Sequence, residues 1–143
     1  MRFRIHFRHV EQEIFVVDIL IVDDNADYLE LLKDALYGKG YSVYTAGDGI
    51  EGCEILTSKD IDIIISDIKM PRLDGIKLHQ FARQLDQYKR TKFVFITAYR
   101  EMYGNMLELN PEIDFFLEKS APVQDIIKTV NKLAFGDFAG VWV

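Results

Sequence analysis

The stretch IDIIISDIKMP, residues 61–71, decides the fold. Its β-branched run at residues 63–65 is too continuous for a strand with one wet face and too short for a helix, so it predicts a strand buried on both faces. Pro71 cannot continue a sheet ladder, and the following Asp74-Gly75 pair is typical of a turn. Asp67 is therefore expected at the carboxyl end of a central parallel strand, where open α/β sheets place their chemistry.

Four more apolar runs predict the other strands, and segments with helical periodicity separate them. The strands are expected at residues 19–22, 41–46, 93–96 and 113–117, and the helices near residues 27–38, 50–58, 76–88, 101–109 and 122–133. This alternation predicts an α/β fold of three layers: a doubly wound, parallel five-stranded sheet with helices on both faces and right-handed crossovers. The expected strand order is 2-1-3-4-5, as in flavodoxin-like folds.

Length and composition limit the function classes. The 143 residues suffice for one domain, and 49% apolar with 28% charged residues is a globular composition. A net charge of −6 argues against nucleic-acid binding through bulk electrostatics. The sequence contains neither an apolar run long enough to span a bilayer nor a signal-peptide core. Cys53 is the single cysteine, which excludes an internal disulfide and favours a cytoplasmic location.

The domain is expected to cover residues 18–135, between an extension at 1–17 and a tail at 136–143. In the extension, Phe3, Ile5 and Phe7 alternate with basic residues, which indicates an extra strand with one basic face. It could be an edge strand, a dimerisation arm or a loosely held end. The tail could pack on the domain or begin a linker to a further segment, and the sequence does not decide between these.

Polar side chains follow four of the predicted strands. Asp23 and Asp24 come after the first core strand, Asp67 after the third, Thr97 after the fourth and Lys119 after the fifth. In the order 2-1-3-4-5 the first and third strands are neighbours, which brings three carboxylates into one crevice. Such close like charges need compensation, which Mg²⁺ and a lysine ammonium can supply. Asp67 would be a nucleophile that forms an aspartyl phosphate.

Each of these residues also has an ordinary structural explanation. An Asp-Asp pair before a helix often only caps it, a lysine near a helix start is usually a surface charge, and threonine is simply a good strand residue. Taken singly, each is better explained in this way. Together, at the carboxyl ends of the strands of one sheet, they indicate a site for phosphoryl chemistry.

The chain from about residue 18 to 134 resembles a response regulator receiver domain of two-component signal transduction. The resemblance rests on ILIVDDN at 19–25, DIKMP at 67–71 with Asp74-Gly75, FITA at 95–98 and FFLEK at 115–119. The separations fit the family: 43 residues from Asp24 to Asp67, 30 more to Thr97 and 22 more to Lys119.

The resemblance implies a role for each matching position. Asp67 would accept a phosphoryl group from a histidine kinase or phosphotransfer protein, and slow autodephosphorylation would be the only other activity. The implied Mg²⁺ ligands are Asp24, Asp67, the backbone carbonyl of Lys69 and, largely through water, Asp23. Thr97 and Lys119 would contact the phosphoryl group, while Thr97 and Phe116 would form the switch. The switch would change a face made by the fourth helix, fifth strand and fifth helix, which would bind a downstream protein or a second copy.

Two departures from the family pattern affect these expectations. Ser120 stands where the family usually has proline after the lysine, and a cis bond without proline would cost about 3 kcal/mol, so the loop there is expected to differ. Lys69 and Tyr99 occupy positions that flank the phosphoryl group in the family. A cation and a bulky ring there would hinder in-line water, which predicts a long-lived phosphate.

Three other functions remain as alternatives. A haloacid-dehalogenase type enzyme would have a second aspartate two residues after the nucleophile, where this chain has Lys69. A flavodoxin-like nucleotide binder would have a glycine-rich phosphate loop after the first strand, which is absent from the sequence. A phosphate-independent receiver-like binding module keeps the same fold. The sequence shows no output domain, so the chain is either a stand-alone regulator or a domain of a longer polypeptide.

Overall fold

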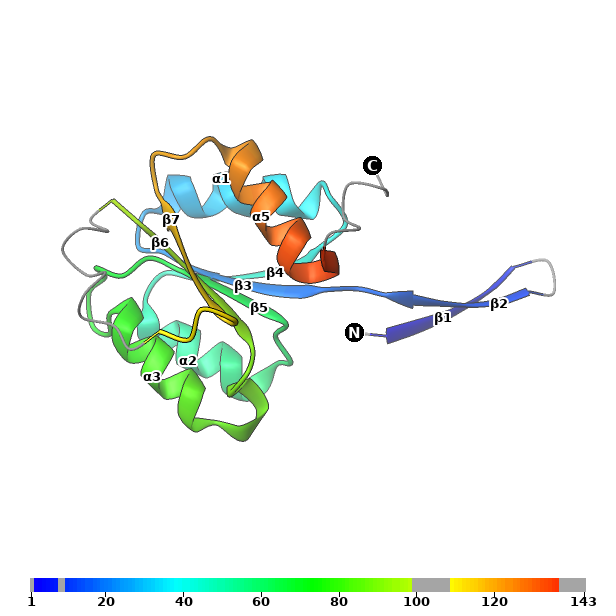
Figure 1. The fold of residues 1–143 in the computed structure, drawn as a ribbon, viewed down its shortest axis with the longest axis horizontal. Helices are drawn as coiled ribbons and strands as arrows, with labels where there is room; N and C mark the ends of the chain where they lie inside the picture. The colour runs from blue at the N-terminus through cyan, green and yellow to red at the C-terminus, as the bar shows by residue number, and fades with distance from the viewer. Residues whose placement is uncertain (1, 8–9, 99–108, 137–143) are drawn as a thin grey trace.

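A five-stranded parallel sheet forms the centre of the computed structural model, which describes residues 2–7, 10–98 and 109–136. Its strands are β3 (Asp18–Val22), β4 (Ser42–Ala46), β5 (Ile63–Ser66), β6 (Lys92–Thr97) and β7 (Asp114–Glu118). They lie in the order β4-β3-β5-β6-β7, with every neighbouring pair parallel (Figure 1). This is the predicted order 2-1-3-4-5, so the predicted fold class is confirmed.

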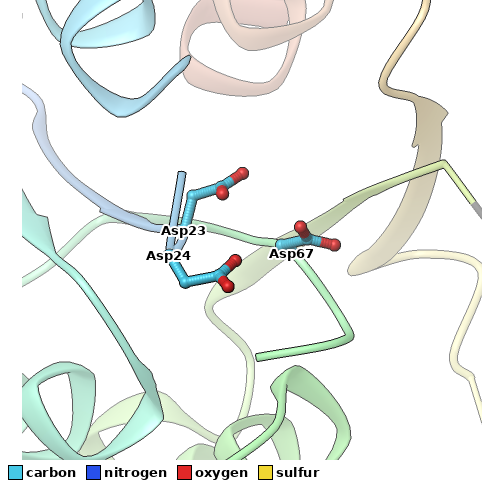
Figure 2. A group of neighbouring side chains, drawn as sticks. All are labelled: Asp23, Asp24 and Asp67. Atoms are coloured by element: carbon cyan, nitrogen blue, oxygen red, sulfur yellow. The ribbon is translucent and has the colours of Figure 1, made fainter. Parts of the chain in front are cut away.

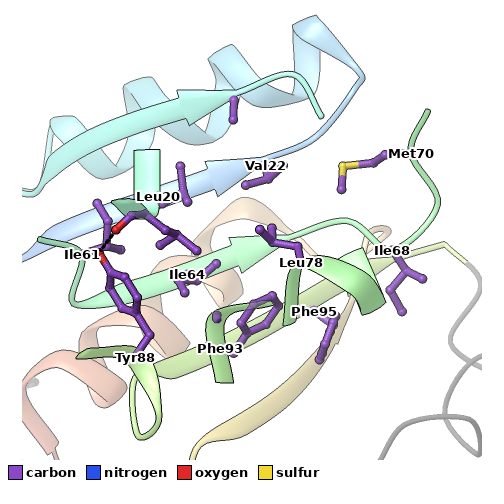
Figure 3. Close-up of a cluster of buried hydrophobic side chains, with 13 residues drawn as sticks. Leu20, Val22, Ile61, Ile64, Ile68, Met70, Leu78, Tyr88, Phe93 and Phe95 are labelled. Atoms are coloured by element: carbon purple, nitrogen blue, oxygen red, sulfur yellow. Dashed lines mark hydrogen bonds between the residues drawn. The ribbon is translucent and has the colours of Figure 1, made fainter. Parts of the chain in front are cut away.

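Within the described residues, two helices cover each face of this sheet. The helices are α1 (Ala26–Tyr37), α2 (Gly49–Ser58), α3 (Gly75–Gln84) and α5 (Val123–Phe135). Leu32 and Leu36 of α1 pack with α5 on one face, around Ile19 and Ile21 of β3. The other residues of β3 point to the opposite face, where α2 and α3 complete a second apolar cluster (Figure 3). Burial of β3 and β5 on both faces explains their uninterrupted apolar sequence.

In the described part of the chain, three helices follow strands that end at the same edge of the sheet, and each of the three has a side-chain cap. The Asn25 side chain accepts from the Tyr28 amide, the Asp48 side chain from the Glu51 amide and the Asp74 side chain from the Lys77 amide. Such caps satisfy amide groups that the first turn of a helix leaves unpaired. The polar residues that follow the strands therefore fix where the chain turns into its helices.

The structure differs from the sequence prediction between residues 76 and 88. The helical pattern there was expected to be continuous, but α3 ends at Gln84, Leu85 is extended, and Asp86–Tyr88 forms a separate 3₁₀ turn. The buried Tyr88 hydroxyl donates to the Leu56 and Lys59 carbonyls, and this anchor requires the chain to turn toward α2. A tertiary contact thus ends a helix that the local periodicity would continue.

An antiparallel hairpin precedes the sheet and extends away from it (Figure 1). Its strands are β1 (Arg2–Phe7), where the period-two pattern predicts a strand, and β2 (Val10–Phe15), which the sequence analysis did not predict. The helix expected near 101–109 and the tail at 137–143 lie outside the described residues, apart from Leu109, which is not helical. Among the helices described, none is long and apolar enough to cross a membrane.

Candidate functional site

Three carboxylates meet at the carboxyl edge of the sheet. Ligand atoms of Asp23, Asp24 and Asp67 all lie within 4.8 Å of one another (Figure 2). The pairing of β3 with β5 causes this, because Val22 is opposite Ser66 and the Asp67 amide donates to the Val22 carbonyl at 2.9 Å. The three carboxylates therefore lie together, as the strand order inferred from the sequence implies.

Lys119 lies against two of these carboxylates. Its Nζ atom is 2.8 Å from Asp23 Oδ2 and 3.0 Å from Asp67 Oδ2. The Lys119 amide donates to the Thr97 carbonyl at 3.1 Å, which ties the loop after β7 to the end of β6. The other Asp67 oxygen accepts from the Ile68 amide at 2.7 Å, so both carboxylate oxygens have partners.

Burial and the nearby charges change the protonation of this group. Burial raises the pKa of Asp23 above its usual value of 3.8, although Lys119 and the Asn25 amide oppose the shift. Burial alone would lower the pKa of Lys119, but its hydrogen bonds to Asp23 and Asp67 raise it above 10.5. Lys119 therefore stays protonated at neutral pH. The ionised Asp23 carboxylate, by contrast, lowers the stability of the folded state.

Replacing Asp23 with asparagine is therefore expected to stabilise the metal-free protein. When folding raises the pKa of a carboxyl, the fold loses stability as the pH rises from 3.8 through the folded pKa. Above the folded pKa the carboxyl is ionised and the full destabilisation is present. The amide keeps an oxygen for the Asn25 amide and removes the charge. Thermal melting in EDTA at pH 7 should show a higher melting temperature than that of the wild type.

The control for this measurement is Asp27→Asn, which removes an exposed carboxylate from the first turn of α1. That variant should not melt at a higher temperature, because the carboxylate interacts favourably with the helix N-terminus. An unchanged or lower melting temperature for Asp23→Asn would contradict the assigned cost of the buried charge.

The donor set fits a hard divalent cation. Three carboxylates offer only oxygen atoms, which Mg²⁺ prefers, and one of them, Asp24, is exposed. Lys69, two residues after Asp67, is exposed in the loop that leads to α3. Ligation by its carbonyl, like the individual roles of the three aspartates, stays a prediction.

The two predicted switch residues occupy neighbouring strands. Thr97 is the buried last residue of β6, and Phe116 is half-buried in β7. The Phe116 ring stacks on Phe95 at a centroid distance of 5.2 Å. The described residues contain no cis peptide bond, so the Lys119–Ser120 bond is trans, and the Ala121 amide donates to the Glu118 carbonyl in the following turn.

Tyr28 belongs to this site and was missed in the sequence analysis. Lys119 Nζ lies 4.7 Å from the centre of the Tyr28 ring, so the ammonium contacts an aromatic face as well as two carboxylates. Burial raises the pKa of Tyr28 to about 12. Its position four residues after Asp24, near the start of α1, is the sequence signal that could have identified it.

Comparisons with known proteins point to one family. The family model described as the response regulator receiver domain matches residues 19–131. The sensor histidine kinase RcsC of Escherichia coli is 45% identical over 67 residues, which are 47% of this chain and 7% of the kinase. A probable chemotaxis protein CheY of Rhizobium etli is 40% identical over 83 residues, 57% of this chain and 64% of that protein.

A solved structure agrees with these sequence matches. The response regulator TrrA of Thermotoga maritima, crystallised in complex with Mg²⁺ and BeF, superposes with a TM-score of 0.73 at 32% identity. The match covers 82% of this chain and 99% of TrrA. By contrast, the chain spans less than a tenth of the RcsC kinase, so the match to RcsC concerns one segment of that protein.

Proposed function

This chain belongs to the response regulator receiver domain family, and from this premise we propose that Asp67 is its phosphorylated residue. Receiver domains are the phosphoacceptors of two-component systems. The observation that supports Asp67 is its position between two other carboxylates and the Lys119 ammonium, at the end of a central strand. The phosphate-independent binding module is not favoured, because the chain matches the family model and carries Asp67, Thr97 and Lys119 at the positions that match the family's motifs.

In the proposed reaction, a phosphohistidine of the partner protein is the donor. Its P–N bond breaks as an Asp67 carboxylate oxygen bonds to phosphorus, and the imidazole leaves and takes up a proton. The Ile68 amide, which donates to Asp67 Oδ1, holds the plane of the carboxylate during the attack. Lys119 already lies 3.0 Å from Asp67 and would pair with the phosphoryl oxygens as charge develops on them.

Mg²⁺ would be held by Asp23, Asp24, Asp67 and the Lys69 carbonyl, and it would neutralise charge on the phosphoryl oxygens. Asp23 would act largely through water. The chain's own carboxylates keep this position strongly negative, which disfavours an incoming phosphoryl group until the cation binds. Beyond accepting the phosphoryl group, we assign only slow autodephosphorylation to the chain.

Phosphorylation is proposed to change a surface through Thr97 and Phe116. Thr97 would move toward the phosphoryl group, and the Phe116 ring would turn further inward against Phe95. The affected face would include β7 and α5, together with the expected helix near 101–109. A downstream protein or a second copy would bind there. The proposed location is the cytoplasm, where phosphoryl donors charged by ATP are found.

The direct test is intact-mass spectrometry of the protein after incubation with acetyl phosphate. With Mg²⁺ we expect a gain of one phosphoryl group per chain, and with EDTA in place of Mg²⁺ no gain. Circular dichroism of both samples should show that the fold is the same. A folded protein that gains no phosphoryl group with Mg²⁺ present would overturn the proposal in favour of the phosphate-independent binding module.

A further inference from the structure

The loop between Asp67 and α3 carries Lys69 and is fixed to the domain on its inner side. Ile68 and Met70 are buried in the apolar cluster beneath the sheet (Figure 3). The Gly75 amide donates to the Ile68 carbonyl at 2.7 Å, which closes the loop at its base. A Cβ atom at Gly75 would lie 2.0 Å from the Asp67 carbonyl oxygen, so only glycine permits this closure.

The outer side of the same loop is held by α2. Arg72 Nε and Nη2 lie 2.6 Å and 2.5 Å from Asp48 Oδ2, a two-pronged ion pair with the N-cap residue of α2. Next to it, the Gly49 amide donates to the Leu73 carbonyl at 3.1 Å. The chains approach so closely that a Cβ atom at Gly49 would lie 2.3 Å from that carbonyl oxygen. Two polar contacts thus join the loop to the start of α2.

The backbone of Arg72 adopts an unfavourable conformation. Its φ of 65° makes it the one non-glycine residue with positive φ in the part of the chain that is described. A left-handed conformation is unfavourable for an L-residue, and glycine would avoid this cost. Unlike glycine, arginine has a side chain that can pair with Asp48, and this side chain is 57% exposed. Strain of this kind tends to persist where it positions a functional segment.

We propose that Arg72, through Asp48, is a positioning residue for Mg²⁺ binding. This inference rests on the proposed function, in which the Lys69 carbonyl is a metal ligand. Lys69 lies between the two buried anchors, Ile68 and Met70, and Arg72 follows two residues after Met70. The Arg72–Asp48 pair thus holds the outer end of the loop, which limits the conformations open to the Lys69 carbonyl. Without the pair, Mg²⁺ must order the outer part of the loop as it binds, and its affinity falls by that cost.

Simple electrostatics predicts the opposite sign. Arg72 carries a positive charge near a cation site, so its removal alone should strengthen Mg²⁺ binding. Positioning predicts that its removal weakens binding. Arg72→Gly is the informative change, because glycine tolerates the positive φ and the fold should keep its stability. A loss of affinity in a variant of unchanged stability cannot then be ascribed to unfolding or to charge.

The experiment is calorimetric titration of the full chain with Mg²⁺, paired with thermal melting of each variant. Arg72→Gly is expected to bind Mg²⁺ about fivefold more weakly than the wild type, as for the loss of a well-formed surface ion pair. Asp48→Asn keeps a good N-cap and should lose a similar factor. If the two residues act as a unit, the double variant should be no weaker than either single variant.

The matched control is Arg90→Ala. Arg90 is also exposed and paired with a carboxylate, Glu112 at 3.0 Å, but it precedes β6 and so lies at the opposite end of the sheet. Its loss should leave Mg²⁺ affinity unchanged. Unchanged or tighter binding by Arg72→Gly would overturn this inference alone. A wild-type chain that binds no Mg²⁺ would overturn the proposed function and this inference together.

Discussion

Asp67→Asn is expected to abolish phosphoryl uptake from acetyl phosphate, with no phosphorylated protein detectable in the intact mass. The amide is neutral and cannot act as the anionic nucleophile that forms an aspartyl phosphate. Its oxygen can still accept from the Ile68 amide, which in the wild type lies 2.7 Å from Asp67 Oδ1. The variant should therefore keep its fold, and it should fail to take up phosphate because it lacks the nucleophile.

Asp74→Asn is the control for this measurement. Asp74 lies in the same loop and caps α3 by accepting from the Lys77 amide, a role that asparagine fills equally well. This variant should take up phosphate at close to the wild-type rate. If Asp67→Asn still gained a phosphoryl group, the acceptor would be a different side chain, with Asp23 and Asp24 the first candidates to map by fragmentation of the phosphorylated protein.

The second large effect is expected far from this site, at a buried polar cluster between α3 and β7. Asp114 Oδ1 is 2.9 Å from His79 Nε2 and 2.6 Å from Arg83 Nη2, and the Asn110 amide donates to Oδ2 at 2.9 Å. Only 2% of the Asp114 side chain is exposed. His79 also packs against the Phe93 and Phe95 rings, so the cluster is part of the core.

Asp114→Ala is expected to destabilise the fold by about 3–5 kcal/mol, the usual cost of removing one partner from a buried charged group. The change removes the acceptor of the Asn110 amide and of Arg83 Nη2, while Arg83 Nη1 keeps its hydrogen bond to the Tyr88 carbonyl. In thermal melting this corresponds to a fall of roughly 10 °C or more. Glu112→Ala is the matched control, because Glu112 is 74% exposed in its pair with Arg90 and should contribute less than about 1 kcal/mol.

The same cluster predicts a dependence on pH. Burial by itself would raise the Asp114 pKa, but the hydrogen bonds from His79, Asn110 and Arg83 lower it below 3.8. A carboxyl of this kind stabilises the fold fully above 3.8, and the contribution is lost as the pH falls through the lower, folded value. The stability difference between wild type and Asp114→Asn should therefore shrink in acid. A difference that is independent of pH would contradict this assignment.

Most of the sheet could be predicted because its strands carry a local signal. Residues 63–65 and 19–22 are apolar without interruption, and the structure buries both strands on both faces. The strand order was expected from the flavodoxin-like arrangement of such sheets, and it placed Asp23 and Asp24 beside Asp67. The second strand of the hairpin, Val10–Phe15, was missed because Gln12 stands where the alternation requires an apolar residue.

By itself, the sequence determined the five strands of the sheet, the approximate positions of the described helices between and after them, and the polar residues that follow the strands, because periodicity and turn chemistry act over a few residues. Tertiary structure decided which side chains meet. Lys119 contacts both Asp23 and Asp67. Arg72 pairs with the N-cap residue of α2, 24 positions earlier, and Asp114 binds side chains of α3. These contacts depend on how connections cross and how closely backbones approach. That geometry exists only once the sheet and its helices have packed.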